Sequence, residues 1–218
     1  MNRIIIFFLL TLLLQDAVAQ PPEKPAKEIS RLKATGIDTL IQLVKEGTGL
    51  GDTLPGLGWV HTIFEVNYLV YKNKNAVFAR KFVRHCGKDC SGTYESVSGT
   101  VRIKDDSLFR YLGTSLGQLS AETVYPLIYR YTDSLSGQVV YNTVKTYHPT
   151  IYYVGIHLAQ QDIMKMIVTE NLERYVSGED TVTENINYAY NRQTKLVQFF
   201  EFLKRKMEAY DRQFRFSK

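Results

Sequence analysis

The residues best suited to chemistry are two cysteines, which lie close together and beside a histidine. They are Cys86 and Cys90, the only cysteines of the chain, and His85 precedes the first. Thiol–disulfide catalysts place two residues between their cysteines, at a helix start, whereas this pair has three. Neighbouring residues on a strand point to opposite faces, and no second cluster offers a fourth ligand, so zinc is disfavoured. We expect a Cys86–Cys90 disulfide and no bound metal, provided that the compartment is oxidising.

The N-terminus predicts such a compartment. Arg3 precedes the uncharged apolar run Ile4–Leu14, and Ala17-Val18-Ala19 is a small-x-small site, which together are typical of a secretory signal peptide cleaved after Ala19. An uncleaved N-terminal anchor is the alternative, but the run is about half the roughly 20 residues of a membrane-spanning helix. No later segment is long and apolar enough to span a bilayer. We expect an exported protein, in the periplasm or outside the cell.

Other candidates for catalysis are weak. His61 and Glu65 share a face of an expected strand but lie about 13 Å apart at ~3.3 Å per residue, too far to hold one ion. The glycine-rich segment 47–58 lacks the endings of phosphate-binding loops, and no GxSxG motif is present. The sequence therefore predicts no cofactor. An exported hydrolase with an unrecognised site near this loop, Trp59 and His61 remains the alternative to a non-enzymatic protein.

Composition favours a globular protein that contacts surfaces other than nucleic acid. The 218 residues are 44% hydrophobic and 22% charged, and the net charge is +5, too small and too scattered for a nucleic-acid partner. The chain has 15 Tyr and 11 Phe against a single Trp, which favours β-sheet. We expect a signal peptide at 1–19, a flexible proline-rich leader at 20–28 and one domain at 29–218.

The hydrophobic pattern indicates the elements that must position any site. We expect a helix over 26–46 and a hairpin over 59–84 whose paired residues sum to 147, so that Val70 faces Val77. Further strands are expected at 98–104, 139–147, 151–158 and 163–169, with a helix as the alternative for the last segment. Helices are expected to begin at 105–107 and 120–122. An apolar stripe predicts a C-terminal amphipathic helix from about Asn191. The fold class is therefore α+β, with antiparallel hairpins forming a sheet on which helices pack.

Tyrosines crowd the segment 125–153. Most of them can be explained as sheet-building residues, but Tyr also offers a flat apolar ring with a polar tip, which suits binding. We expect a non-enzymatic exported module that contacts a protein or an envelope glycan through a Tyr-rich sheet surface. The residues of that expected surface are Trp59, His61, Tyr141, Tyr147, Tyr152 and Tyr153.

Overall fold

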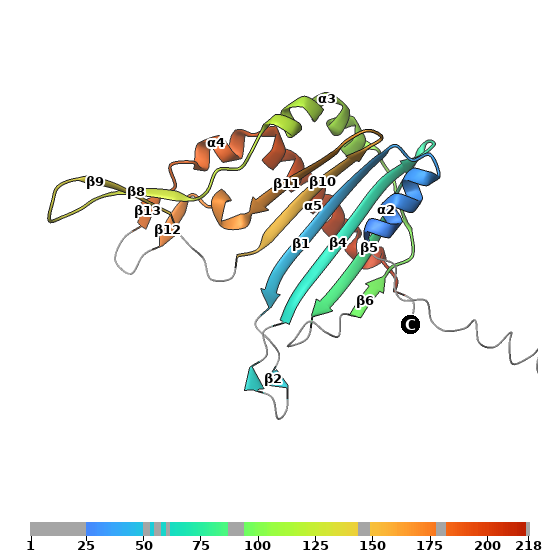
Figure 1. The fold of residues 1–218 in the computed structure, drawn as a ribbon, viewed down its shortest axis with the longest axis horizontal. Coiled ribbons are helices and arrows are strands. Elements are labelled where there is room, and N and C mark those ends of the chain that lie inside the picture. The colour runs from blue at the N-terminus through green and yellow to red at the C-terminus, as the bar shows by residue number, and fades with distance from the viewer. Residues whose placement is uncertain are drawn as a thin grey trace, which may run out of the picture.

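One large antiparallel sheet forms the centre of the protein (Figure 1). The computed structural model describes residues 25–49, 53–54, 58–59, 62–86, 94–143, 149–177 and 182–216. The sheet contains β1 (Thr39–Gly49), β4 (Thr62–Asn73), β5 (Ala76–Cys86), β6 (Tyr94–Val97), β7 (Val101–Ile103), β10 (Ile151–Leu158) and β11 (Asp162–Val168). Its order is β11-β10-β1-β4-β5-β6, and β7 also pairs with β5. β1 therefore lies in the middle, between a strand that soon follows it and one from much later in the chain.

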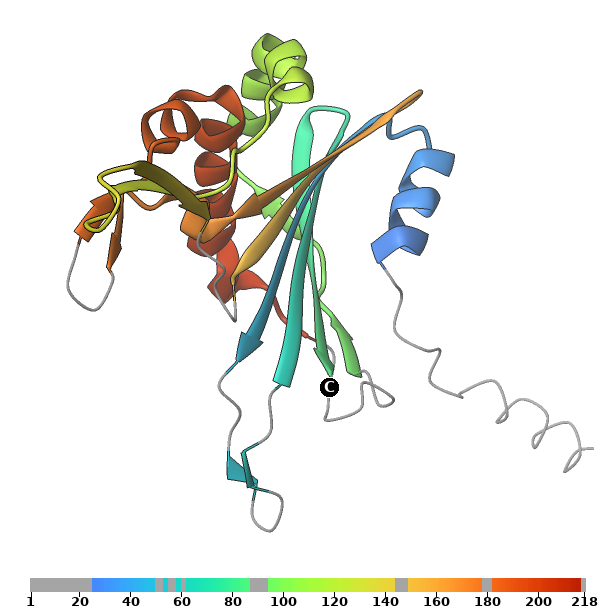
Figure 2. The same cartoon turned by 60° about the vertical axis from the view of Figure 1, so that its left-hand side comes forward.

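Helices cover one face of the sheet, here called the α5 face (Figure 2). They are α3 (Ser107–Ala121), α4 (Tyr188–Gln193) and α5 (Lys195–Tyr210), and the short helix η3 (Asp211–Gln213) follows α5. Thr194 begins α5, since its hydroxyl accepts a hydrogen bond from the backbone nitrogen of Val197. The apolar stripe of α5 packs on strand residues such as Ile41, Val70 and Val154, and these contacts form the main core. The side chains of α5 buried in this core are Leu196, Phe199, Phe200, Leu203 and Met207.

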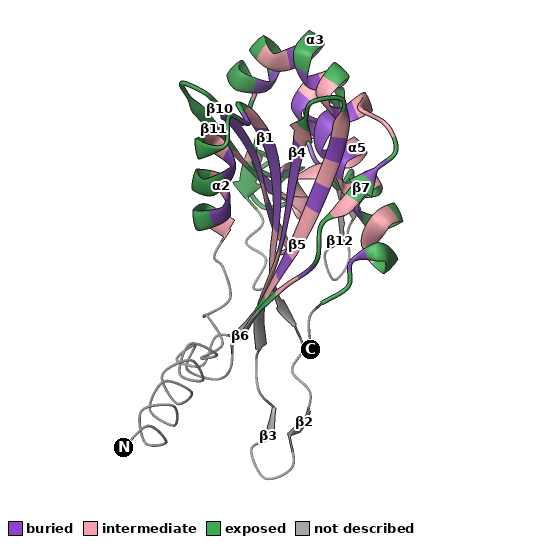
Figure 3. Ribbon diagram, turned by 90° about the vertical axis from the view of Figure 1, so that its right-hand side faces the viewer, coloured by how far each residue is buried: buried purple, intermediate pink, exposed green. Residues whose placement is uncertain are grey.

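The opposite face, here called the α2 face, carries a single helix among the residues that the structure describes. α2 (Pro25–Ala34) covers only part of the sheet, and its inner side is buried while its outer side is exposed (Figure 3). A smaller apolar cluster lies beneath the helix, and Leu32 of α2 is part of it. The other buried members of the cluster are Ile37, Leu40, Leu69, Tyr71 and Phe82.

Three two-stranded sheets complete the described structure. They are β2 (Thr53–Leu54) with β3 (Gly58–Trp59), β8 (Ile128–Thr132) with β9 (Val139–Thr143), and β12 (Tyr175–Ser177) with β13 (Val182–Glu184). A short helix, η2 (Thr169–Leu172), connects β11 to the last of these. Within the described residues, no helix has both the length and the hydropathy needed to cross a membrane.

The α+β class is confirmed, together with the antiparallel sheet and the C-terminal helix. The expected helix over 26–46 is half wrong, because it ends at Ala34 and β1 begins at Thr39. Leu40, Ile41 and Val44 are buried on two faces of a central strand, so their helix-like spacing reflects cover from both sides. The expected helix start at 120–122 is also wrong, since α3 ends at Ala121 and no helix follows before β8.

The hairpin of β4 and β5 exists, but its register differs from the expected one. Val70 pairs with Ala79 rather than Val77, and paired residues sum to 149. The turn consists of Lys74 and Asn75, and Lys74 has a positive φ of 52°. The expected turn was centred one residue earlier, and this difference shifts every pair by two residues. Because the shift is even, each side chain stays on the expected face.

Candidate functional site

The tyrosines expected to form one binding surface lie in three different places. Tyr152 and Tyr153 are neighbours on β10 and therefore point to opposite faces. Tyr152 is buried on the α5 face against Phe200, with ring centroids 4.9 Å apart, whereas Tyr153 lines the α2 face. Tyr141 lies on β9, away from both. The expected single platform of Tyr141, Tyr152 and Tyr153 is therefore wrong.

The remaining expected site residues cannot be placed. His61, Tyr147 and Cys90 lie outside the described residues, and so do the side chains of Trp59 and Cys86. The Cys86–Cys90 disulfide thus stays a prediction, as does a hydrolase site near His61. No group of three or more His, Cys, Asp or Glu residues in the described part of the chain is placed to hold a metal ion.

A projecting hairpin, β8–β9, carries much of the exposed apolar surface. We call residues 128–143 the tyrosine arm; it extends away from the large sheet in Figures 1 and 2. Most of the exposed large hydrophobic side chains of the described structure lie on the arm or at its base. They are Tyr131, Leu135, Val139 and Tyr141 on the arm, and Tyr125, Tyr175, Ile186 and Tyr190 at the base. Exposed apolar groups gathered in this way mark interaction sites.

The tip of the arm is a tight turn that leaves Leu135 almost wholly in solvent, at 97% exposure. The Asp133 carboxylate accepts hydrogen bonds from the backbone nitrogens of Leu135 and Ser136, and these bonds hold its pKa below the usual value. Gly137 has a φ of +66°, and its nitrogen donates to the Asp133 carbonyl. An aspartate followed by a glycine at positive φ is a common hairpin closure, so the tip conformation follows from the local sequence.

One edge of the arm has free backbone groups. The Asp133 nitrogen donates to the Gln138 carbonyl, so the hydrogen-bonded pairs of the hairpin are 131 with 140 and 129 with 142. The backbone groups of Val139, Tyr141 and Thr143 therefore point away from β8, and no strand among the described residues pairs with them. β9 itself, with the sequence VVYNT, contains no charged residue.

Buried amide side chains anchor the base of the arm. The Asn185 carboxamide accepts from the backbone nitrogen of Ile128 and donates to the carbonyls of Asn171 and Glu173. Asn191 bonds both backbone groups of Tyr125 in the same manner. Asn185 and Asn191 are buried, so these bonds fix the arm on η2 and α4 in place of a large apolar core.

The α2 face contains a second feature, a cavity of about 410 Å³ that we call the hollow. It lies on the part of the sheet that α2 leaves open, and the first turn of α2 borders it. Its apolar lining is Pro25, Ala26, Val44, Phe82, Val83 and Met164, and its polar lining is Gln42, Glu46, Glu65, Asn67, Arg84 and Tyr153.

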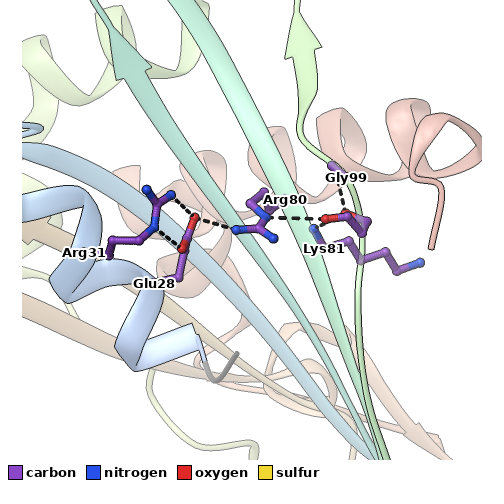
Figure 4. A network of polar contacts seen from close by, with 6 residues as sticks. Glu28, Arg31, Arg80, Lys81 and Gly99 are labelled. Atoms are coloured by element: carbon purple, nitrogen blue, oxygen red, sulfur yellow. Dashed lines mark hydrogen bonds and ion pairs between the residues drawn. The ribbon is translucent and has the colours of Figure 1, made fainter. Parts of the chain in front are cut away.

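A buried carboxylate holds α2 on the sheet (Figure 4). Glu28 of α2 has no solvent exposure, and both of its oxygens are bound by guanidinium groups. Nε and one terminal nitrogen of Arg31 each donate at 2.7 Å, and Nη1 of Arg80 on β5 donates at 2.7 Å. Hydrogen bonds from Arg31, and further bonds and charge from Arg80, outweigh desolvation and lower the pKa of Glu28 to about 2.

A chain of polar side chains leads from the other end of α2 to the floor of the hollow. Lys33 donates to Asp162 at 2.9 Å, and Asp162 lies 3.2 Å from Nδ1 of His157. Nε2 of His157 lies 2.9 Å from Oε1 of Gln42, and Nε2 of Gln42 donates to Oδ1 of Asn67 at 3.2 Å. His157, Gln42 and Asn67 are all buried. Burial is the largest influence on His157 and lowers its pKa, against the opposing charge of Asp162.

The sequence predicted neither the anchoring residues Asn185 and Asn191 nor the row of polar side chains that leads from Lys33 to Asn67. Gln42 was the one available signal, because a single amide within the apolar run from Leu40 to Val44 calls for a buried partner. Comparison of the chain with models of known protein families, with curated proteins and with solved structures gave no significant match.

Proposed function

We propose that this chain is an exported, non-enzymatic binding module that contacts another protein through the tyrosine arm. An extended segment of the partner adds to the outer edge of β9 as a further strand. The observation that carries the proposal is the free edge of β9, where Val139, Tyr141 and Thr143 direct their backbone groups outward from an uncharged strand. The signal-peptide pattern supports export to the periplasm or the cell exterior.

The edge has the properties that strand addition requires. Main-chain hydrogen bonds supply affinity in this mode, and alternate side chains supply specificity. Proteins commonly protect exposed edges with Lys, Pro or a bulge, but β9 has neither Lys nor Pro in its sequence. Val139 and Tyr141 are both exposed and lie on one face of the hairpin. They can pack against every second side chain of an added strand.

The charges near the arm favour a partner segment with little net charge. Arg174 at the base pairs with Glu184, and on the arm itself Arg130 is offset by Asp133. Anionic membranes attract clusters of Lys and Arg, which the arm lacks. A neutral segment rich in β-branched and aromatic residues fits this surface better than a lipid headgroup does.

Selection from a displayed library of random peptides on the mature chain tests the proposal. We expect the selected peptides to lose binding when Val139 becomes proline, because Val139→Pro removes an outward-pointing N–H. That change leaves the bonds to β8 intact, and proline is tolerated at such edge positions. Val139→Ala is the matched control, since it shortens the side chain but keeps the donor.

Three results would contradict the proposal. The first is peptides that bind Val139→Pro as well as the parent chain, while circular dichroism shows both proteins folded. The second is a dimer of the parent chain that Val139→Pro makes monomeric in sedimentation, because the occupant of the edge would then be a second copy. The third is failure of every selected peptide to compete with the others, which would place the binding sites away from one edge.

A further inference from the structure

The hollow on the α2 face has an unused polar group in its floor. Asn67 is 3% exposed, and its Oδ1 accepts from Gln42. Its Nδ2 makes no hydrogen bond with any residue that the structure describes, although Asn67 lines the hollow. Among the described side chains, only His157 has a fully buried polar atom without a hydrogen-bond partner, its Nδ1. Nδ2 of Asn67 is therefore accessible from the hollow, where a ligand acceptor can bind it in place of water. The cavity is also within the size range of small-molecule sites.

The charged groups around the hollow are already engaged with one another. Arg84 donates to Glu65 at 2.5 Å across the β4–β5 pair. Burial, together with the nearby Glu46 carboxylate, raises the pKa of Tyr153. An anionic ligand would meet the two carboxylates, and a cationic one would have to compete with Arg84 and Tyr153. The charges therefore select a neutral ligand.

The side chains of His157 and Gln42, which lie behind Asn67, determine whether the NH₂ group or the carbonyl oxygen of Asn67 faces the hollow. When His157 is doubly protonated, it donates to Gln42 and Asp162, and Asn67 then presents its NH₂ group to the cavity. When His157 is neutral with its proton on Nδ1, the amides of Gln42 and Asn67 turn over, and Asn67 presents its carbonyl oxygen. Besides Asp162, the charged group facing His157 is Lys33 of α2. A ligand hydroxyl satisfies both arrangements, because it donates and accepts.

Gly155 leaves the space that this chain of amides needs. It lies opposite Gln42 in the β1–β10 pair. A Cβ atom at position 155 would lie 3.1 Å from the Gln42 side chain and from Nε2 of His157. The apolar side of the hollow, with Val44, Phe82 and Met164, offers a surface for C–H groups. A neutral sugar matches this lining, because its uncharged ring carries hydroxyl groups beside C–H faces.

We propose that the hollow beneath the first turn of α2 binds a neutral saccharide unit, with Asn67 as its anchoring residue. This site is separate from the edge of β9, so either proposal can fail without the other. Gln42 and His157 are positioning residues, since they act on the ligand through Asn67.

Saturation-transfer NMR on the mature chain with glucose, N-acetylglucosamine and their disaccharides tests this proposal. We expect binding of at least one of these sugars, with an affinity that falls about tenfold or more in Asn67→Ala, the effect of losing one buried hydrogen bond. Ala26→Trp fills the hollow from α2 without touching the amides and should abolish binding. Lys27→Trp, at an exposed neighbouring position outside the lining, should bind like the parent chain.

If Asn67→Ala does not fold, the comparison of Ala26→Trp with Lys27→Trp still tests the proposal. Binding of none of the neutral sugars overturns the proposal. So does binding that persists in Ala26→Trp, or preferential binding of glucuronate or glucose 6-phosphate. Sugar binding that persists in Val139→Pro would confirm that the hollow works independently of the arm.

Discussion

The α2 face and the tyrosine arm differ in which side chains they bury and which they leave in solvent. On the α2 face, charged groups are buried and paired, and a helix with a small apolar contact is held by Glu28 and Lys33. On the arm, charges are few, apolar side chains are exposed, and neutral amides fix the base. Ion pairs with fixed geometry position a helix whose apolar contact is small. Exposed rings on a rigid hairpin are instead suited to contact a partner.

Loss of the carboxylate under α2 should have the largest effect. Glu28→Gln removes the buried carboxylate that both Arg31 and Arg80 bind, and removing one partner of a buried ion pair costs about 3 kcal/mol or more. We expect the free energy of unfolding, measured in urea, to fall by about that amount. Glu173→Gln is the control, because it makes the same substitution at an exposed glutamate. It should change the free energy of unfolding little. A loss below about 1 kcal/mol would show that α2 is held by its apolar contacts alone.

Acid should weaken the same contact by a somewhat smaller amount. The pKa of Glu28 is lowered from 4.5 to about 2, so its contribution is complete above pH 4.5 and disappears as the pH falls toward 2. Linkage gives a loss of about 2 kcal/mol between pH 7 and pH 3 from this one group. The difference in stability between the parent chain and Glu28→Gln should shrink over that window. A difference that is independent of pH would contradict the assigned pKa.

Removal of the partly exposed pair at the other end of α2 should have a modest effect. Lys33 and Asp162 are both accessible to solvent, so Lys33→Met should cost about 0.5 kcal/mol. Lys33 is also the main reason for the lowered pKa of Asp162, which NMR titration of the carboxyl carbon should show to rise in the variant. An unchanged Asp162 titration would show that the two side chains do not pair in solution.

Replacement of an exposed ring on the arm should have the smallest effect on stability. Tyr141 is 59% exposed, so Tyr141→Ala should change the free energy of unfolding by less than about 0.5 kcal/mol. Tyr152→Ala is the contrasting variant, since the buried ring packs on Phe200 and its loss should cost about 3 kcal/mol or more. A large cost for Tyr141→Ala would mean that the arm packs on part of the protein and is not free to bind.

The sequence predicted the helix α5, which buries one face, and failed for β1, which is covered on both faces. The stripe of α5 identifies one buried side, and the helix begins at Lys195, close to the expected start at Asn191. β1 is buried on both sides, so Leu40, Ile41, Leu43 and Val44 form a run without a strand period. The register of the β4–β5 hairpin depends on which residues of a polar run form the turn, and Lys74-Asn75 is not a strong hairpin signal.

The two candidate sites were only partly visible in the sequence. Tyr141 was expected on a binding surface, because the high frequency of tyrosine in the segment 125–153 is visible in the sequence. The neighbours Tyr152 and Tyr153 follow the strand alternation and cannot share a surface, which the expected platform ignored. Asn67, Asn185 and Asn191 gain their roles from partners far along the chain. Pairing of that kind depends on topology, which local patterns do not specify.

The central position of β1 has a consequence for how the chain acquires its structure. Its neighbour β4 arrives early, and β5 follows at once, so a three-strand meander can assemble from local contacts. Its other neighbour, β10, comes only after β9, and pairings so distant in sequence form slowly. During that interval one backbone row of β1 is open to any other extended chain. We therefore expect dilution or a chaperone, more than added stability, to limit aggregation during refolding.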